Sequence, residues 1–318
     1  MNRRDFIHHL AGLYGALPLL SACVEKAPLR LGIHPWIGYE TIYLARDFGW
    51  LSRDSVLVEG RSAGDSLKAM REGLLEAGCL TLDEVLLARA DGIPLAIVAI
   101  LDVSAGADVL MARPEMRRLP AIKGKRIGIE RSALGELMLT TALDAAGLAR
   151  ADVQVRDVPP DRQLAAWRAG QIDVAVTYEP TASMLEREGA VRLFDSRQAP
   201  ETIIDVLAVH RDRMRGRRPQ LRALLAAHFR GLEHLRVNRQ DALHRIASRE
   251  GVSYEEAKRS LAGVTLPNLA HNRTYMSRDA RIGQTARKLN RLMVEHSLLK
   301  APDRLENLFD QTYLPDGP

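Results

Sequence analysis

The chain carries an unbroken apolar run at residues 95–101, Leu95-Ala96-Ile97-Val98-Ala99-Ile100-Leu101, which is followed directly by Asp102. A short continuous apolar run of this kind is typical of a strand that is buried on both faces of a sheet. Working outward toward the N-terminus, the pattern predicts further strands at 29–33, 56–59 and 77–81, with helices at 40–48, 67–74 and 83–90 between them. This alternation predicts an open, mostly parallel α/β sheet.

The same pattern restarts in the second part of the chain. Strands are predicted at 125–129, 153–155 and 172–176, and helices at 136–146 and 161–169. From residue 219 onward the sequence is mostly helical, with amphipathic stretches at 220–237, 241–250, 254–261 and 281–296. The restart, together with a chain length of 318 residues, predicts two α/β lobes and a helical C-terminal region.

The composition excludes several classes of protein. Lysine plus arginine exceed aspartate plus glutamate by 45 − 40 = 5, and these charges are spread along the chain. Aromatic residues make up only 5% of the sequence, so no nucleic-acid partner is predicted. After residue 23 no apolar run reaches the roughly 18 residues of a spanning helix, which excludes an integral membrane transporter.

The N-terminus has the features of an export signal. A basic start containing Arg3 and Arg4 precedes the apolar segment 10–20, and Arg3-Arg4-Asp5-Phe6-Ile7 resembles the twin-arginine pattern. The next residues, Leu20-Ser21-Ala22-Cys23, resemble a bacterial lipobox, in which the cysteine is lipidated. We therefore predict a signal peptide at 1–22, lipidation of Cys23, a tether at 23–28 and a periplasmic, membrane-anchored lipoprotein.

The sequence contains no pattern that indicates catalysis. It lacks GxGxxG, GxxxxGK[ST], HExxH and GxSxG motifs, and its histidines have no metal-ligand spacing. Cys79 lies inside a predicted buried strand without a basic neighbour, so we interpret it as an inert core thiol. No catalytic residue, cofactor or metal is predicted, and the protein is not expected to be an enzyme.

Polar and aromatic side chains recur at the carboxyl ends of the predicted strands, where open α/β sheets bind ligands. Ser62, Ser66 and Asp83 could equally be helix N-caps, and Trp36 could fill a gap in the core. Asp102 also follows a predicted strand. The predicted ligand-binding residues are Trp36, Tyr39, Ser62, Thr81, Asp83, Ser104, Asp108, Ser132, Tyr178, Glu179 and Asp205.

The order of several motifs is similar to that of periplasmic solute-binding proteins of the nitrate, sulfonate, taurine and thiamine-pyrimidine-precursor type. The resemblance covers residues 29 to 215 and rests on residues 36–40, 43–45, 49–51, 80–84, 102–108, 119–128, 170–176, 178–180 and 204–209. It implies two α/β lobes of the type II-like periplasmic binding fold, which are joined by two crossovers and close on a ligand. The implied lobes are 29–104 plus 205–318 and 105–204, with crossovers near 104–108 and 200–205.

This resemblance implies a binding protein that delivers a small solute to the permease of an ABC importer. The same fold could instead serve as a ligand sensor for a membrane signalling protein or, less in keeping with the missing motifs, as a pyrimidine-precursor enzyme. The predicted site contains Asp83, Asp108, Glu179 and Asp205, which would repel nitrate or a sulfonate. We therefore predict a nitrogen-containing solute, a cationic amine or an N-heterocycle. Alternatively, Asp108 and Asp205 could brace the crossovers by capping backbone N–H groups.

Overall fold

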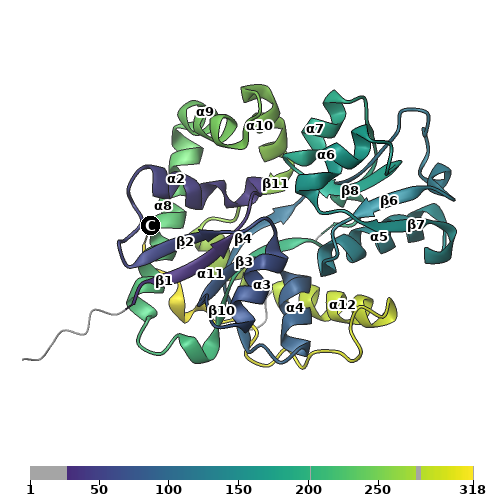
Figure 1. Cartoon of the computed structure of the whole chain (residues 1–318). Helices are drawn as coiled ribbons and strands as arrows, with labels where there is room; N and C mark the ends of the chain where they lie inside the picture. Colours follow the sequence, from purple (N-terminus) through teal and green to yellow (C-terminus); the bar gives the residue numbers. More distant parts are fainter. Residues whose placement is uncertain (1–26, 201, 277–280, 318) are drawn as a thin grey trace, which may run out of the picture.

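A computed structural model describes residues 27–200, 202–276 and 281–317. The predicted signal peptide and Cys23 lie outside these residues. The described chain folds into two lobes, each built on a twisted sheet with helices packed on it (Figure 1). The first lobe contains a sheet of order β11-β4-β10-β3-β1-β2, and the second a sheet of order β7-β6-β8-β5-β9.

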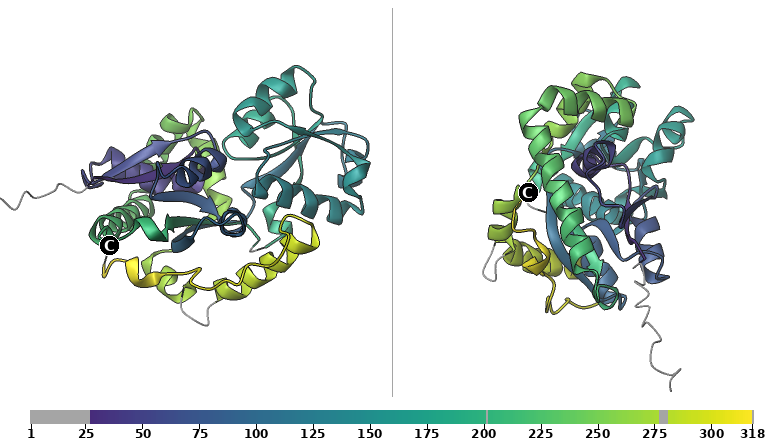
Figure 2. Two further views of the ribbon diagram at one scale, coloured as in Figure 1. Left: turned by 60° about the horizontal axis from the view of Figure 1, so that its bottom comes forward. Right: turned by 90° about the vertical axis from the view of Figure 1, so that its left-hand side faces the viewer.

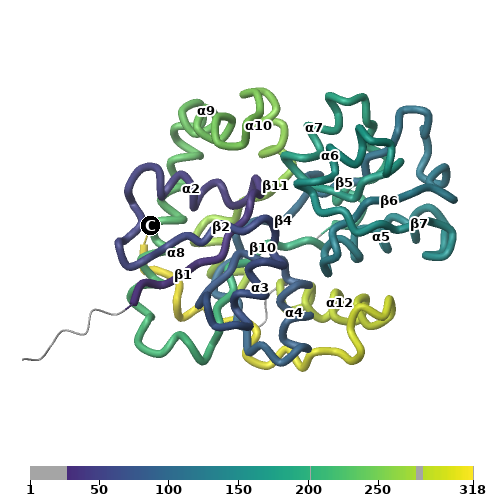
Figure 3. Tube along the Cα trace, viewed as in Figure 1, coloured from purple at the N-terminus to yellow at the C-terminus, as the bar shows by residue number. Residues whose placement is uncertain are grey.

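The strands of the first sheet are β1 (Leu29–Ile33), β2 (Ser55–Glu59), β3 (Ala77–Thr81), β4 (Leu95–Ser104), β10 (Ile204–His210) and β11 (Val264–Thr265). Those of the second sheet are β5 (Asp108–Ala112), β6 (Arg126–Ile129), β7 (Gln154–Asp157), β8 (Val174–Tyr178) and β9 (Val191–Asp195). The chain thus leaves the first sheet after Ser104 and returns to it at Ile204, and Figure 3 shows both passages between the lobes.

Strand β4 is buried on both faces, as its apolar sequence predicts. Val98 belongs to the apolar cluster that includes residues of helices α2 (Glu40–Asp47) and α8 (Arg218–Val237). Its neighbour Ile97 belongs to a second cluster, with residues of α3 (Ala63–Arg71), α4 (Leu82–Ala90) and α12 (Arg281–Glu295). Because successive side chains of a strand point to opposite faces, β4 supplies residues to both cores.

The prediction of a mostly parallel sheet is wrong, because both sheets are mixed. β1 pairs in parallel with β2 and β3, whereas β10 runs antiparallel to both β3 and β4. In the second sheet β5 runs antiparallel to β8 and β9, and β6 is parallel to β7 and β8. The antiparallel strands β5 and β10 are those that directly follow the two passages between the lobes.

Helix α5 (Ala133–Ala146) shows how the local sequence determines an element of the second lobe. Ser132 occupies the N-cap, where its Oγ accepts a 3.0 Å hydrogen bond from the backbone N–H of Gly135. The helix ends at Gly147, whose φ of 67° is the left-handed conformation that glycine adopts readily. The other helices of this lobe are α6 (Pro160–Arg168) and α7 (Thr181–Arg187).

The C-terminal region supplies helices to the first lobe and also reaches the second lobe. It comprises α8, α9 (Arg239–Glu250), α10 (Tyr254–Ala262), α11 (Leu269–Tyr275) and α12. Helix α12 extends beneath the second lobe (Figure 2), where Ile282 and Leu289 belong to the same apolar cluster as Leu137 of α5. Among the described residues, no helix has the length and apolar character required to cross a membrane.

Candidate functional site

The two lobes meet at a closed cleft that is lined by residues of both. The remaining space amounts to about 10 Å³, close to the volume needed for one water molecule. The first lobe contributes the ends of β3 and β10 and the segment that follows β1, while the second lobe contributes the ends of β5, β6 and β8. The residues that line this cleft are His34, Trp36, Ala63, Thr81, Glu84, Asp108, Glu130, Leu134, Tyr178 and Asp205.

The mixed order of the first sheet aligns Thr81 and Asp205, which line the cleft, with Asp102 beside them. Asp205 of β10 pairs with Thr81 of β3 on one side and with Asp102 of β4 on the other. Directly paired residues of neighbouring strands point to the same face of a sheet. The carboxyl groups of Asp102 and Asp205 therefore lie side by side, and both side chains are buried.

The segment after β1 holds these two carboxyl groups with aromatic side chains. Trp36 donates a 2.9 Å hydrogen bond from Nε1 to Oδ2 of Asp102. Tyr39 lies in the short helix η1 (Ile37–Tyr39) and donates a 2.5 Å hydrogen bond from its hydroxyl to Oδ1 of Asp205. Gly38 lies between them, and a Cβ at this position would overlap the Asp102 carboxyl group. The close approach of backbone and carboxyl group therefore requires glycine.

The second lobe closes the cleft with Tyr178, which stands at the end of β8. Its ring makes an edge-to-face contact with Trp36, with centroids 5.6 Å apart and an interplanar angle of 90°. His34 makes a similar contact with Tyr39, at 5.2 Å and 87°. Both geometries are favoured by aromatic rings. The Trp36–Tyr178 contact therefore joins the two lobes across the site, and the His34–Tyr39 contact lies within the first lobe.

Further carboxyl groups lie at or near the cleft in both lobes. The buried Asp83 and Glu84 are in the first turn of helix α4, the buried Asp108 begins β5, and the half-buried Glu130 follows β6. Burial raises the pKa of Asp83 to about 6, of Asp108 to about 7 and of Asp102 to about 8. It also raises the pKa of Asp205, Glu84 and Glu130. Among the described residues, Oδ1 of Asp102, Oδ2 of Asp108 and both Asp83 oxygens have no hydrogen-bond partner.

No basic side chain compensates this acidic cluster. Within the part of the chain that the structure describes, neither lysine nor arginine lines the cleft. His34 is buried, which lowers its pKa to about 4, so it is neutral at physiological pH. Its Nδ1 also lacks a hydrogen-bond partner. The cleft thus presents unpaired acceptors, and a ligand that donates N–H groups would satisfy them.

The remaining predicted residues lie away from the cleft lining. Glu179 is buried in the second lobe, where it accepts a 2.6 Å bond from Arg192 and a 3.1 Å bond from the backbone N–H of Ser183. The Ser104 hydroxyl is 2.8 Å from that of Ser196 at the passage between the lobes. Ser62 and Ser132 occupy helix N-caps. These contacts give Glu179, Ser104 and Ser132 partners within the protein.

The alternative role for Asp108 and Asp205 was to brace the crossovers by capping backbone N–H groups. Among the hydrogen bonds of the described residues, neither carboxyl group accepts one from a backbone N–H, and Asp205 is held instead by Tyr39. Five residues of the cleft lining are not among the predicted ligand-binding residues, namely His34, Ala63, Glu84, Glu130 and Leu134. Glu84 accepts a 2.9 Å bond from the backbone N–H of Thr81, the reciprocal contact of a capping box. The sequence Thr81-Leu82-Asp83-Glu84 has the spacing of a capping box, and this is the signal from which the position of Glu84 at the start of α4 could be predicted.

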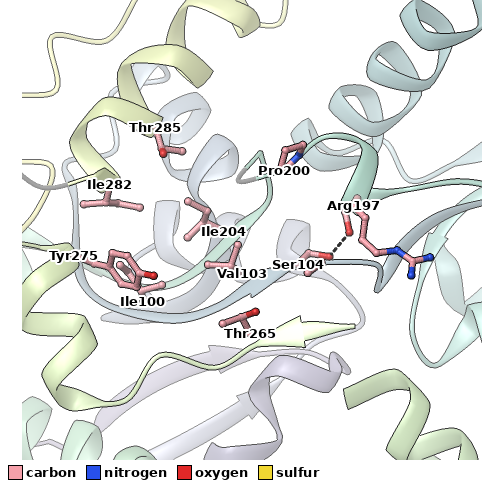
Figure 4. Close-up of a pocket in the computed structure, with 12 residues that line it drawn as sticks. Ile100, Val103, Ser104, Arg197, Pro200, Ile204, Thr265, Tyr275, Ile282 and Thr285 are labelled. Carbon is pink, nitrogen blue, oxygen red and sulfur yellow. Dashed lines mark hydrogen bonds between the residues drawn. The ribbon is translucent and has the colours of Figure 1, made fainter. Parts of the chain in front are cut away.

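A larger cavity of about 350 Å³ lies on the other side of the passages between the lobes. Val103 and Ile204 line it (Figure 4). Ile204 neighbours the cleft residue Asp205 in sequence, so their side chains point to opposite faces of the sheet. Of its polar groups, the hydroxyls of Ser104 and Ser196 are bonded to each other, and Arg197 is paired with Asp195. These three groups therefore have partners within the protein, unlike the unpaired acceptors at the cleft.

The lobes, the mixed sheets and the cleft between them define the class of periplasmic binding proteins. The chain belongs to the NMT1-like family, whose model matches residues 22–249. It is 25% identical over 154 residues to the taurine-binding periplasmic protein of Escherichia coli (strain K12). This match covers 48% of each protein, so the chain spans about half the length of that curated relative.

Solved structures share the fold. The alkanesulfonate-binding protein of Xanthomonas axonopodis pv. citri, bound to MOPS, superposes with a TM-score of 0.74 at 20% identity and covers 90% of this chain and 99% of that one. A desulfurization enzyme gives a TM-score of 0.65 at 15% identity, covering 91% and 97%. The predicted resemblance to periplasmic solute-binding proteins and the two-lobed α/β fold are thus confirmed.

Proposed function

We propose that this protein captures a small, cationic, nitrogen-containing organic solute between its lobes and delivers it to an ABC importer. The observation that carries the proposal is the set of buried carboxyl groups at the cleft, which no lysine or arginine among the described residues neutralises. A protonated amine or amidine would supply both the missing charge and N–H donors. Trp36 and Tyr178 would provide aromatic contacts for a ring or an ammonium group.

Two of the proteins named above bind taurine and alkanesulfonates, respectively, and this chain's cleft favours a different charge. An isolated sulfonate next to ionised carboxylates in a poorly solvated site costs several kcal/mol unless a cation compensates. The carboxyl groups could be neutralised by protonation, but a sulfonate would still need donors to its oxygens. The Nε1 of Trp36 and the hydroxyl of Tyr39 already donate to Asp102 and Asp205.

We propose the lobe boundaries given by the sequence, 29–104 plus 205–318 and 105–204, with closure about the two passages between them. Movement of one lobe against the other about a few connecting residues is the usual hinge motion of a two-lobed binding protein. In the structure the cleft is closed and nearly filled by side chains. Entry of a solute therefore requires the lobes to separate first.

We also propose that Cys23 carries the lipid that anchors the protein to a membrane. The support is the sequence Leu20-Ser21-Ala22-Cys23 behind the paired arginines. The Cys23→Ala variant should be exported but recovered in the soluble periplasmic fraction, whereas the unchanged protein sediments with membranes. Equal sedimentation of both proteins would show that the cysteine is no anchor.

We favour binding over catalysis, although a desulfurization enzyme shares the fold. Cys79, the free cysteine among the described residues, is fully buried, and its burial raises the pKa of the thiol well above its usual value. A thiol of this kind is a poor nucleophile. The carboxyl groups at the cleft are therefore better explained as acceptors for a bound cation.

Calorimetry on residues 27–318 tests the proposed ligand class. The cationic probes are benzylamine, benzamidine and putrescine, 4-aminopyrimidine represents N-heterocycles, and the anions are ethanesulfonate and nitrate. We expect at least one nitrogenous probe to bind and the anions to give no heat. Asp205→Asn should weaken that binding at least tenfold, or ~1.4 kcal/mol. Asp54→Asn, an exposed aspartate, is the matched control. Tight binding of ethanesulfonate without a response to any nitrogenous probe would overturn the proposal.

A further inference from the structure

Asp102 and Asp205 face each other as a directly paired couple across the antiparallel strands β4 and β10. Like charges at such positions repel, and here both side chains are buried, with exposed fractions of 0% and 3%. Each carboxyl group receives one strong donor, from Trp36 and Tyr39 respectively. One donor each does not offset the burial of two adjacent negative charges.

The groups around this pair provide no positive charge. η1 contributes Tyr39, β3 contributes Cys79, α4 contributes Glu84 and β5 contributes Asp108, and all of these are neutral or acidic. Burial raises the pKa of Tyr39 and of Cys79, so both stay protonated. The neutral His34 lines the same cleft with an unpartnered Nδ1. This buried nitrogen, which is separate from the carboxyl groups, also lacks the partner that a ligand would supply.

We propose that the empty site exchanges protons for its cationic ligand: the Asp102–Asp205 pair holds at least one proton while the cleft is empty and releases it when a protonated amine or amidine binds. Two close carboxyl groups that share a proton are a known solution to like-charge burial. The proposal deepens the proposed function, on which it rests. It makes capture weaker in acid, because protons and the solute compete for the same oxygens.

The raised pKa values of both carboxyl groups agree with this geometry. A carboxyl group whose pKa is higher in the folded than in the unfolded state keeps its proton in the folded state only, at every pH between the two values. The folded state is then destabilised as the pH rises through this window. Buried His34 and His228, whose pKa is lowered to about 4, act in the opposite direction, but only below about pH 6.5.

Urea unfolding of the ligand-free protein between about pH 6.5 and about pH 8.5 measures the retained protons. Each retained proton makes the unfolding constant rise up to tenfold per pH unit. We expect this rise in the unchanged protein and in the control Asp54→Asn. Asp102→Asn lacks one of the two carboxyl groups and should retain fewer protons. The factor by which its unfolding constant rises per pH unit should therefore be up to tenfold smaller than in the unchanged protein. Asp205→Asn serves the same purpose if Asp102→Asn does not fold.

Proton release on binding is measured by titrating whichever of benzamidine or putrescine binds, in phosphate and in Tris at the same pH, because the two buffers differ in their heat of ionisation. Release of close to one proton supports the exchange, and binding without release overturns it. An unfolding constant that rises equally in the unchanged protein and in both variants also overturns it, while leaving cation capture intact. Conversely, if no nitrogenous probe binds although the pH-dependent rise is present, the proposed function fails and the protonated pair remains.

Discussion

The carboxyl groups of Asp102 and Asp205 are each bound by the polar tip of an aromatic side chain. Trp36 and Tyr39 are almost fully buried, so they fill space in the cleft while their N–H and O–H groups donate to the acids. Hydrogen bonds to charged groups contribute about 1.5–3 kcal/mol, and an orphaned buried acceptor costs a similar amount. These aromatic residues therefore act as supports for the carboxyl pair.

Tyr39→Phe should destabilise the protein, because it removes the hydrogen bond that the Tyr39 hydroxyl donates to the Asp205 carboxyl group and keeps the ring. We expect a loss of about 1–3 kcal/mol in the free energy of unfolding, measured by urea titration near neutral pH. Tyr254→Phe, at a half-buried position on α10, is the control and should change this value by less than about 0.5 kcal/mol. An equal effect of both substitutions would contradict the supporting role of Tyr39.

Five of the ligand-binding residues predicted from the sequence line the cleft: Trp36, Thr81, Asp108, Tyr178 and Asp205. The predicted residue Tyr39 is hydrogen-bonded to one of them, Asp205. Their contact with a ligand stays a prediction. Glu179 could not be separated from this group by sequence, because its partner Arg192 lies on β9, a strand that the pattern did not indicate. A local sequence pattern does not show whether an arginine elsewhere in the chain pairs with a carboxyl group at a strand end.

At the scale of elements, Asn272 connects helix α11 to strand β4. Its Oδ1 accepts a 2.7 Å bond from the backbone N–H of Ile100, and its Nδ2 donates a 3.0 Å bond to the carbonyl of the same residue. The side chain is fully buried. The short strand β11 pairs with Ser104 and Val103 of β4 and does not reach Ile100. Asn272 therefore supplies the hydrogen-bond partners for the backbone of β4 at Ile100.

Asn272→Ala should cost about 2–4 kcal/mol of unfolding free energy, because it leaves two buried backbone groups of Ile100 without a partner. Chemical denaturation followed by circular dichroism measures this loss. Gln154→Ala, whose side chain is exposed on β7, should change stability by less than about 0.5 kcal/mol. If Asn272→Ala were equally mild, the side chain would not be needed to complete β4.

Hydrophobic periodicity predicted most elements well, with differences at the ends. β1 and β3 agree with prediction, and α5 begins three residues earlier than expected because Ser132 caps it. β4 continues through Asp102 to Ser104, beyond the apolar run, since its pairing with β10 and β11 extends over these residues. Such pairing is a long-range property, and a local pattern does not contain it. For the same reason, the local pattern predicts neither the strands β5 and β10 nor their antiparallel direction.

At the scale of the whole molecule, an ion pair joins the lobes at a distance from the cleft. Arg187 at the end of α7 in the second lobe donates a 2.6 Å bond from Nε to Oε1 of Glu256 on α10 in the first lobe, and a second bond from its Nη2. The two helices lie side by side in Figure 1. The hydrogen bonds from Arg187 hold the pKa of Glu256 at about 2, so this carboxyl group is charged under physiological conditions.

Arg187→Gln should favour the open state and weaken ligand binding about two- to fivefold, because a partly exposed ion pair contributes up to roughly 1 kcal/mol. The effect should shrink as salt is raised, since salt screens the pair. Calorimetry with the nitrogenous probe that binds, at low and high salt, measures it. Arg168→Gln is the control, because Arg168 pairs with Glu188 inside the second lobe. A salt-independent loss, or an equal loss in the control, would contradict a latch between the lobes.

The two-lobed architecture was predictable because the α/β pattern restarts and the order of motifs matches the family. The acidic character of the cleft was partly predictable, from Asp83, Asp108 and Asp205. The pairing of Asp102 with Asp205 was not, because these residues are far apart in sequence and become neighbours only through β10. The whole site therefore depends on the return of the chain from the second lobe.

The charge of the preferred ligand is the most direct test of this account. Native mass spectrometry of residues 27–318, mixed with equal concentrations of benzylamine, benzamidine, putrescine, ethanesulfonate and nitrate, shows which compound remains bound. We expect the mass of one nitrogenous cation on the unchanged protein and its loss in Asp205→Asn. Retention of ethanesulfonate or nitrate by the unchanged protein, with no cation bound, would contradict the assignment of the cleft as a site for cationic solutes.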